Sequence, residues 1–402
     1  MVGLMAQEKV RIIHIIPSLE VGGAEKCLLR VLQGMDRHQF ECAVLSLSDL
    51  GALGSEIQTL GIPVFVLGTI GGIPGPYSFF RALKIVRQFR PDLIQSWLYL
   101  GDAWAVLLGR CLGVQKVLWN IRCSDAFAKT PSVKTRLVFR LNIFLSRFAF
   151  AVVGNSKQGI RFHQEMNFRI PHWKYIPNGF ESSFFPDATT LRGAFRRELG
   201  LDSNAFLIGM VSKFHPLKDC ETFVAAAHLI SKRFSNVHFA LVGDGLVPDN
   251  ATLMRLIGNQ ARNFHLVGNR QDIPKILLDL DLFTLTSISE GFPNALGEAL
   301  CAGVPCVATD VGDVREMVGA CGTVVPPKDP RVLANSWEKW IQMDTRARRQ
   351  IGEEGQRQAK ARFSLEEIIP RYEEFYSWAA TARKFQTLRK SVATVESKRD
   401  GA

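Results

Sequence analysis

The sequence lacks the cysteine spacing of a zinc site or of a dithiol redox site. It has eight cysteines, but they are scattered, with no C-x-x-C pair and no histidine at a zinc-ligand spacing. No secretory signal is recognisable at its start, because the first apolar run, Ile12–Ile16, stops at Pro17 after five residues. Such cysteine usage is typical of a reducing compartment, so we expect a cytoplasmic protein.

The chain also has no low-complexity tract and no short-period repeat. One long stretch, residues 57–80, carries no charge, as a membrane span would. It contains five glycines and three prolines, which break helices, so we expect a strand at Val64–Leu67 followed by a loop. A transmembrane helix is therefore not expected.

The length and composition favour a globular protein with two cores. The 402 residues, of 44.9 kDa, suffice for two domains of roughly 150–200 residues each. The hydrophobic content of 47% excludes a disordered or fibrous chain. Lysine and arginine exceed aspartate and glutamate by 49 to 38, and the resulting charge of +11 favours a polyanionic or membrane-surface partner. No basic and aromatic platform for nucleic acid is recognisable, so we expect no nucleic-acid partner.

Short apolar runs of strand length alternate with segments of helical period, and this pattern occurs twice. The runs are RIIHIIP, ECAVLSL, PVFVLG, DLIQSW and KVLWNI, then AFLIGMVS, HFALVG, DLFTLTS and PCVATD. Runs without polar alternation are typical of parallel strands that are buried on both faces. The sequence therefore predicts an α/β fold with two parallel sheets, divided near residues 182–202. The last helix is expected over residues 370–390, ahead of a polar tail.

The segment TSISEGFPNALGEALCAGVPCVATD, residues 286–310, places two glutamates in an E-x7-E spacing. Glu290 follows an apolar strand, where ligands gather in open α/β sheets. Pro293 disfavours helix at Phe292, so the next helix begins near Asn294, a good N-cap residue, and Glu298 lies about one turn inside it. The free amides of such a helix start favour a phosphate.

A nucleoside diphosphate sugar needs this arrangement, with amides for the diphosphate between one carboxylate for the sugar and another for the ribose. A helix-capping loop with an ordinary acidic first turn explains the local pattern equally well. A glycosidase pair fits poorly, because two carboxylates beside a phosphate site do not suit acid and nucleophile roles on a neutral sugar.

Taken with its neighbours, this segment resembles the retaining GT-B glycosyltransferases of family 4 (glycosyl transferases group 1). The resemblance covers about residues 10–380. The matching motifs are PSLEVGGAEK (17–26), IPNGF (176–180), HPLKD (215–219), LVGDG (241–245), SEGFPNALGEALCAGVPCVATDVGDVREMV (289–318) and GTVVPPKDP (322–330). It implies a GT-B fold of two Rossmann-like domains whose sheets face each other across a cleft: an acceptor domain, 1–185, and a donor domain, 186–370. The segment 371–402 is then a helix that packs back on the N-terminal domain, followed by the tail.

The resemblance also implies site residues. Glu290 matches the glutamate that contacts the donor sugar, and Lys218, with Lys213 in place of a usual arginine, would face the diphosphate in the catalytic region. The donor-binding set comprises Gly22, Gly23, Phe292, Pro293, Asn294, Ala295, Leu296 and Glu298, where Glu298 takes the ribose, Gly22 and Gly23 let the backbone approach the phosphates, and residues 292–296 present amides. Without the resemblance, the Gly-Gly pair would be an ordinary strand-to-helix turn and the lysines solvated surface residues.

The N-terminal half departs from the family. Many members place a histidine where this chain has Arg122, so Arg122 is either an acceptor-side or phosphate contact or a buried structural arginine. The D-x-D at 279–281 runs into an apolar strand and is interpreted as structural, so no metal and no cofactor are expected.

The implied reaction moves a sugar from a UDP- or GDP-sugar to an acceptor hydroxyl, with retention, in cell-surface polysaccharide or lipid-linked oligosaccharide synthesis. A nucleotide-sugar epimerase on the same fold and a non-catalytic nucleotide-sugar-binding partner stay open as alternatives. The acceptor is a sugar or a lipid-linked sugar.

Between Asp125 and Glu165 the chain has no acidic residue. This segment places an anionic membrane surface among the expected partners, with the protein peripheral on its inner face, and a core helix with a solvated basic face is the alternative. Its basic residues are Lys129, Lys134, Arg136, Arg140, Arg147, Lys157 and Arg161, interleaved with Val133, Leu137, Val138, Leu141, Phe144, Leu145 and Phe148.

Overall fold

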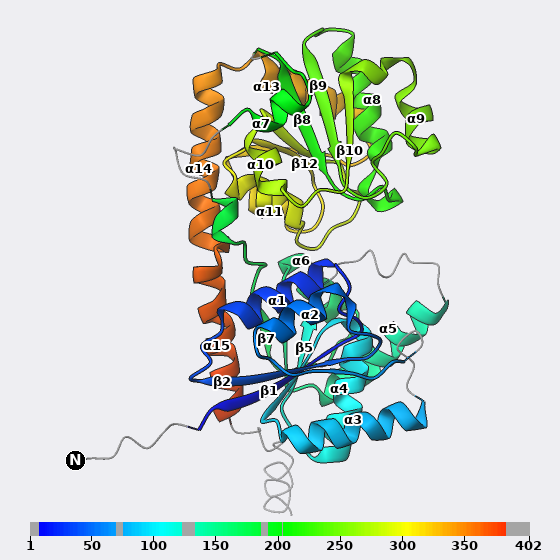
Figure 1. Cartoon of the computed structure of the whole chain (residues 1–402), viewed down its shortest axis with the longest axis vertical. Helices are drawn as coiled ribbons and strands as arrows, with labels where there is room; N and C mark the ends of the chain where they lie inside the picture. The colour runs from blue at the N-terminus through cyan, green and yellow to red at the C-terminus, as the bar shows by residue number, and fades with distance from the viewer. Residues whose placement is uncertain (1–7, 70–74, 123–132, 186–191, 203, 383–402) are drawn as a thin grey trace, which may run out of the picture.

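The computed structural model describes residues 8–69, 75–122, 133–185, 192–202 and 204–382, and it contains two parallel sheets stacked end to end along the long axis (Figure 1). The N-terminal sheet has seven strands in the order β3-β2-β1-β4-β5-β6-β7, and the C-terminal sheet six in the order β10-β9-β8-β11-β12-β13. Every pair of neighbouring strands in the described part of the chain is parallel, as the unalternating apolar runs predict. The α/β GT-B fold is confirmed.

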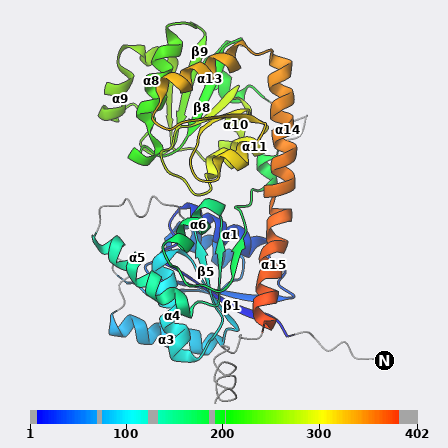
Figure 2. The same ribbon diagram turned by 180° about the vertical axis from the view of Figure 1, so that it is seen from behind.

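The elements of the N-terminal part are β1 (Val10–Ile16), α1 (Gly23–Gly34), β2 (Phe40–Ser46), α2 (Gly51–Thr59), β3 (Val64–Val66), α3 (Pro76–Phe89), β4 (Leu93–Ser96), α4 (Leu98–Leu112), β5 (Val117–Ile121), α5 (Val133–Leu145), η3 (Ser146–Phe148), β6 (Ala151–Gly154), α6 (Lys157–Glu165) and β7 (Trp173–Tyr175). Helices cover both faces of this sheet (Figure 2). The strands β6 and β7 were not among the predicted runs.

The C-terminal part contains η4 (Ser182–Phe184), α7 (Ala194–Glu198), β8 (Phe206–Val211), η5 (Pro216–Lys218), α8 (Cys220–Ser231), β9 (Val237–Val242), α9 (Ala251–Ile257), η6 (Gly258–Asn263), β10 (Phe264–Gly268), α10 (Ile273–Leu278), β11 (Leu282–Leu285), α11 (Asn294–Cys301), β12 (Cys306–Thr309), α12 (Val314–Val318), β13 (Gly322–Val325), α13 (Pro330–Gln342), α14 (Thr345–Phe363) and α15 (Leu365–Thr381). The strands β10 and β13 also went unpredicted.

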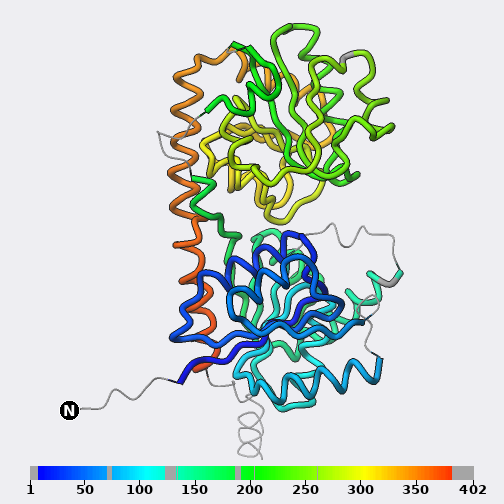
Figure 3. Tube along the Cα trace, in the orientation of Figure 1, coloured from blue at the N-terminus to red at the C-terminus, as the bar shows by residue number. Residues whose placement is uncertain are grey.

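The chain passes between the two parts twice, and the two passages are bonded to each other. The amide of Phe180 donates to the carbonyl of Phe363 at 2.8 Å, and the amide of Leu365 donates to the carbonyl of Phe180 at 3.1 Å. Phe180 is fully buried in the C-terminal core. The tube in Figure 3 shows both passages at the side of the molecule. These two passages, at Phe180 and at Phe363–Leu365, connect the two halves and are here called the hinge.

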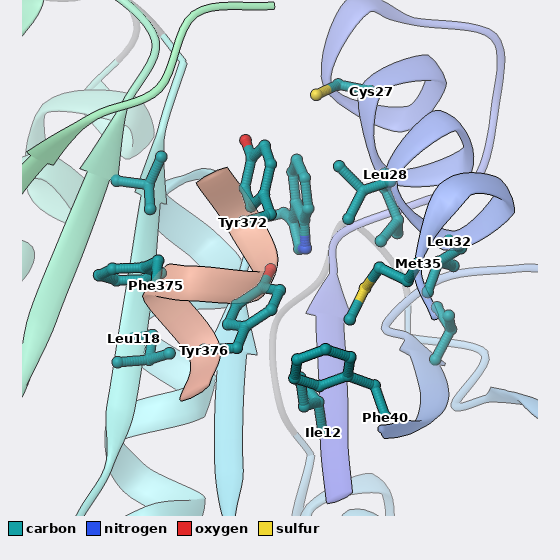
Figure 4. Packing of buried hydrophobic residues seen from close by; sticks show 14 of the residues in the cluster. Ile12, Cys27, Leu28, Leu32, Met35, Phe40, Leu118, Tyr372, Phe375 and Tyr376 are labelled. Atoms are coloured by element: carbon teal, nitrogen blue, oxygen red, sulfur yellow. The ribbon is translucent and has the colours of Figure 1, made fainter. Parts of the chain in front are cut away.

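The helix α15 leaves the C-terminal part and packs on the N-terminal one. Its buried side chains Tyr372, Phe375 and Tyr376 join a cluster with Ile12 of β1 and Leu28 of α1 (Figure 4). The helix begins at Leu365, five residues before the expected start. The expected extension to residue 390 lies partly outside the described residues, and the domain boundaries stay a proposal. No helix of the described chain has both the length and the apolar character to cross a membrane.

Candidate functional site

Three loops at the carboxyl ends of strands in the C-terminal sheet are tied together by short hydrogen bonds. The hydroxyl of Thr286, just beyond β11, donates to the carbonyls of Lys218 and Asp219 at 2.9 and 3.0 Å. The hydroxyl of Thr309, at the end of β12, donates to the carbonyl of Ser287 at 2.5 Å. Because these groups are buried, the bonds fix the loop that carries Lys218 against the loop that carries Glu290.

Glu290 is held by two partners at this edge. Its carboxylate pairs with Lys218, and its Oε1 accepts a hydrogen bond from the hydroxyl of Ser287 at 2.6 Å. Behind it, Gly312 has φ +57°, and a Cβ there would lie 2.4 Å from the carbonyl oxygen of Glu290, so only glycine fits. The side chains of Glu290 and Lys218 keep 12% and 25% exposure, so the pair remains accessible to a ligand.

The helix α11 begins at Asn294, as predicted, but its cap differs from the prediction. Pro293 occupies the N-cap position and no side chain caps the helix. Asn294 is the first helical residue, and its Oδ1 accepts a hydrogen bond from Nδ2 of Asn178 at 2.5 Å. The start of α11 therefore keeps its first-turn amides for a ligand. Phe292 is buried against Phe180 and Phe363, so only its backbone can serve the site.

The Gly-Gly pair lies opposite that helix start. Gly22 precedes α1 and Gly23 begins it, again without a side-chain cap. A Cβ on Gly23 would lie 3.3 Å from Nδ2 of Asn294. The structure thus brings together two helix starts from different halves of the chain, and at the start of α1 the carboxylate of Glu25 accepts from the amides of Ala24 and Glu25. Their aligned N–H groups and dipoles favour an anion between them.

Lys213 lies two residues beyond β8 and is exposed, with no side-chain bond to a described residue. Its loop is packed against LVGDG: Gly243 has φ +136°, and a Cβ there would lie 1.9 Å from the carbonyl oxygen of Ser212. The amide of Phe214 donates to the carbonyl of Asp244 at 2.7 Å. Lys213 is therefore a cation on a fixed loop with no partner among the described residues, whereas Lys218 already has a carboxylate partner.

Glu298 lies on α11 at the boundary between the two halves. Burial raises the pKa of its carboxyl to about 7, and the charges of Arg30 and Lys26 on α1 partly oppose that rise. Arg30 itself bonds to Glu181 at 2.9 Å and to the carbonyl of Gly179 at 3.1 Å. Glu298 therefore faces the N-terminal half and has no full salt bridge of its own among the described residues.

Arg122 is held as a positioning group in this structure. Its Nη1 donates to Oδ1 of Asn178 at 2.8 Å, and its guanidinium lies 5.1 Å from the ring centre of Trp97. Since Asn178 also donates to Asn294, a chain of bonds runs from the N-terminal sheet to the start of α11. Nε and Nη2 of Arg122 are buried and have no partner among the described residues. Its role in acceptor or phosphate binding stays a prediction.

The D-x-D carboxylates serve the C-terminal fold. Asp279 accepts from the amides of Phe195 and Arg196, at 2.7 and 3.3 Å, and Asp281 pairs with Arg196. Both are thus engaged in fixing α7 on the sheet. No cluster of three or more metal-ligating side chains occurs in the described ranges.

Three residues of the assembly were not assigned roles from the sequence. Asn178 lies in the quoted motif IPNGF, and Ser287 in the E-x7-E segment, so both had a signal nearby. Asp313 lies in the quoted motif 289–318, but the sequence did not show its partners: its carboxylate crosses to the N-terminal half and accepts from the hydroxyl of Ser156 and the amides of Lys157 and Gln158, at 2.9, 2.7 and 3.0 Å. It caps α6 from the other half of the molecule.

Comparison with known proteins decides the family. The model described as glycosyl transferases group 1 matches residues 205–343, and that of the glycosyl transferase 4-like domain matches residues 22–179. Together they span both halves of the structure, including the glycine pair and both glutamates. The chain belongs to the group 1 glycosyltransferases.

Similar proteins agree with this assignment. This glycosyltransferase is 25% identical to the UDP-Gal:alpha-D-GlcNAc-diphosphoundecaprenol alpha-1,3-galactosyltransferase of Escherichia coli, over 75% of this chain and 80% of that protein. It is 23% identical to the phosphatidyl-myo-inositol mannosyltransferase of Mycobacterium leprae, over 88% and 93%. Among solved structures it is similar to HepE of Anabaena in complex with UDP, with TM-score 0.78 and 24% identity over 92% of this chain and 100% of that one. It is therefore a retaining glycosyltransferase that uses a nucleotide sugar.

Proposed function

We propose that this glycosyltransferase takes a UDP-sugar, with the diphosphate between the starts of α1 and α11. The observation that carries the proposal is the approach of Gly23 to Asn294, which brings the starts of α1 and α11 to one space, where a diphosphate would displace the carboxylate of Glu25 from the first amides of α1. In this arrangement Glu290 accepts from hydroxyls of the sugar and Glu298 from those of the ribose. The assignment of uridine is supported by the names of the E. coli relative and of the HepE complexes.

The hard step is the development of charge on the departing diphosphate. Preorganised donors stabilise that charge without having to reorient during the reaction. Lys218 lies beside Glu290, so it can turn toward a phosphate oxygen while the sugar hydroxyls replace it as partners of the carboxylate. Lys213 adds a second cation from the neighbouring loop. Closure of the two halves then excludes water and orients the acceptor hydroxyl.

Thermal stabilisation by nucleotides tests the donor site. UDP and UDP-sugars are expected to raise the Tm of the purified protein selectively over GDP and ADP, and Glu298→Ala to abolish the shift. A matched control is Glu316→Ala, which removes an exposed carboxylate outside the site. A shift with none of the nucleotides, or one that Glu298→Ala leaves intact, contradicts the donor site. Turnover of the UDP-sugar without an acceptor would favour the epimerase alternative.

We propose further that the acceptor is lipid-linked and that α5 contacts an anionic membrane. One face of α5 is exposed although it is apolar: Val133, Leu137, Leu141 and Phe144 are 80%, 67%, 44% and 52% exposed. Spaced by four, four and three residues, they form one stripe, here called the α5 stripe. The opposite face is in the core through Phe139.

Charge around the stripe supports the same contact. Arg136 and Arg140 are exposed on α5, and an apolar stripe bordered by arginines is the pattern of a helix that lies at a membrane surface. The side chain of Lys134, and Lys129, lie outside the described residues. The names of the E. coli and M. leprae relatives contain a diphosphoundecaprenol and a phosphatidylinositol acceptor, which fits a membrane-bound substrate.

Vesicle flotation tests this contact. The protein is expected to float with vesicles of phosphatidylcholine and phosphatidylglycerol, and Leu137→Gln with Phe144→Gln to remain in solution. The control with two exchanges of the same kind is Val332→Gln with Leu107→Gln, which changes side chains of 38% and 40% exposure outside α5. Equal flotation of all variants, or flotation of none, contradicts the membrane contact.

A further inference from the structure

A groove of about 710 Å³ lies at the end of the N-terminal sheet that is remote from the donor site. It is lined by the end of α4, by η3 and by residues just before β5, β6 and β7. These are the amino ends of the parallel strands, whereas the donor site uses carboxyl ends, so the groove is separate from the site described above. Its volume is within the range of small-molecule sites.

The walls of the groove carry positive charge without acidic counterparts. Arg110, Arg147 and Arg169 line it together with His172, and no carboxylate does. All three arginines are exposed, and none forms an ion pair with a described residue. Guanidinium groups without a carboxylate partner that line one concavity favour a phosphate, which each can bind through two parallel hydrogen bonds.

The groove is also apolar, which a free phosphate does not require. Phe148, Phe150 and Val114 contribute to its lining. The guanidinium of Arg110 lies 5.0 Å from the ring centre of Phe148, and that of Arg147 lies 4.3 Å from that of Phe144. Arginines stacked on aromatic rings beside apolar walls suit an amphipathic anion, with its phosphate at the guanidinium groups and its chains on the rings.

The α5 stripe continues into this groove. The rings of Phe144, in the stripe, and Phe148, in the groove, are in edge contact with their centres 6.1 Å apart. We propose that the groove binds the phosphate headgroup of an anionic phospholipid from the membrane on which the α5 stripe lies. The inference deepens the membrane contact proposed above and rests on it.

The C-terminal segment of the chain is the alternative occupant of the groove. The helix α15 ends beside the groove: Trp378 lies 5.1 Å from His172 and 5.5 Å from Phe150, ring centre to ring centre. The segment after residue 382 is basic in sequence, so it does not supply the missing counter-charge. It carries Arg383, Lys384, Arg389, Lys390, Lys398 and Arg399 against Glu396 and Asp400.

Calorimetry on the full chain with a soluble short-chain lipid tests the groove without a membrane. Dihexanoyl-phosphatidylglycerol, below its micelle concentration, is expected to bind saturably, and Arg110→Ser with Arg169→Ser to weaken that binding at least tenfold. The control variant replaces two exposed arginines of the C-terminal half, Arg255→Ser with Arg331→Ser. It removes the same charge and is expected to leave the affinity for the lipid unchanged. Dihexanoyl-phosphatidylcholine and glycerol phosphate are expected to bind at least tenfold more weakly.

Each outcome separates the groove from the membrane contact. Absence of saturable binding, equal binding by the groove variant, or equal affinity for glycerol phosphate overturns the lipid site, even if vesicle flotation succeeds. A second stripe variant, Leu137→Gln with Leu141→Gln, leaves the groove lining intact. Short-chain lipid binding that this variant retains, with flotation lost, supports the groove and assigns the membrane contact to the stripe. If the short-chain lipid binds but the wild-type protein does not float, the groove holds and the membrane contact fails.

Discussion

At the scale of single residues, the site depends on side chains that hold each other in place before a ligand arrives. Lys218 and Glu290 are already paired, and Ser287 donates to the same carboxylate. A donor therefore meets groups whose positions are set by hydrogen bonds, which is the condition for electrostatic stabilisation of a departing diphosphate.

Lys218→Met is expected to reduce kcat by about 100-fold, because it removes one positive charge facing the leaving group. Steady-state kinetics with a UDP-sugar measure the loss. Lys275→Met, on α10 and outside the site, serves as the control. A change in KM alone would show that Lys218 binds the donor without stabilising the transition state.

Asn178 accepts a hydrogen bond from Arg122 through Oδ1 and donates one to Asn294 through Nδ2, and a substitution can remove the second bond while keeping the first. Asn178→Asp keeps an oxygen for Nη1 of Arg122 but loses the donor to Oδ1 of Asn294. We expect it to lower kcat/KM about tenfold, the loss of one buried hydrogen bond, with little change in Tm. Activity equal to that of the wild type would show that Asn178 does not position α11.

Glu298 is expected to make stability depend on pH. Its pKa is raised by burial from the ordinary value to about 7, so the folded state binds its proton more tightly than the unfolded state does. Below the unfolded pKa both states are protonated and the group has no effect. As pH rises from the unfolded pKa to above 7, the buried charge destabilises the folded state by on the order of 3 kcal/mol.

The test of this sign is denaturant unfolding of Glu298→Gln. The variant is expected to be more stable than the wild type at pH 8 and equal to it near pH 4. A variant that is less stable than the wild type at pH 8 would show that Arg30 and Lys26 outweigh desolvation.

At the scale of elements, the positions of the helices depend on close contacts that glycine permits. The helix α11 packs on Phe180 through Gly297, where a Cβ would lie 2.3 Å from the ring. Phe180 is fully buried and also lies in the hinge, so the ring cannot move aside without disturbing both. The same contact thus sets where the two glutamates stand relative to the N-terminal half.

Gly297→Ala is expected to destabilise the protein by about 2 kcal/mol through overpacking. Gly75→Ala adds the same methyl where the nearest atom is 3.9 Å away, and it should cost far less. Thermal or denaturant unfolding compares the two. Equal stability of both variants would mean that the Phe180 contact relaxes freely.

At the scale of the whole molecule, Asp313 connects the two halves by capping α6. The carboxylate accepts three hydrogen bonds from the N-terminal half, two of them from amides of a helix start. The neighbouring pair between Lys157 and Glu316 is 46% and 43% exposed, so it contributes little. The relative placement of the halves therefore depends chiefly on Asp313 and on the hinge.

Asp313→Ala is expected to open the molecule, raising the radius of gyration in small-angle scattering and the KM for the donor. Glu316→Ala is the matched control and should leave both near wild-type values. An unchanged scattering curve for Asp313→Ala would place the determinant of the interdomain angle in the hinge alone.

Much of this arrangement was predictable, because it depends on local patterns. The nine apolar runs indicated nine strands, and four were missed, among them β7, whose three residues have the charged Lys174 at the centre. Pro293 fixed the start of α11 to within a residue, but Asn294 was wrongly taken for the cap because its side chain bonds instead to Asn178, which is distant in the sequence.

By itself, the sequence determined the two parallel sheets, the family and the E-x7-E segment at the end of β11. Buried strands and helix starts depend on residues that are consecutive in the sequence, so a local pattern predicts them. Only the tertiary structure decided that Gly23 faces Asn294 and that Asp313 caps α6. These contacts join residues that are distant in the sequence and come together only after the two halves have packed. A local sequence pattern therefore does not predict them.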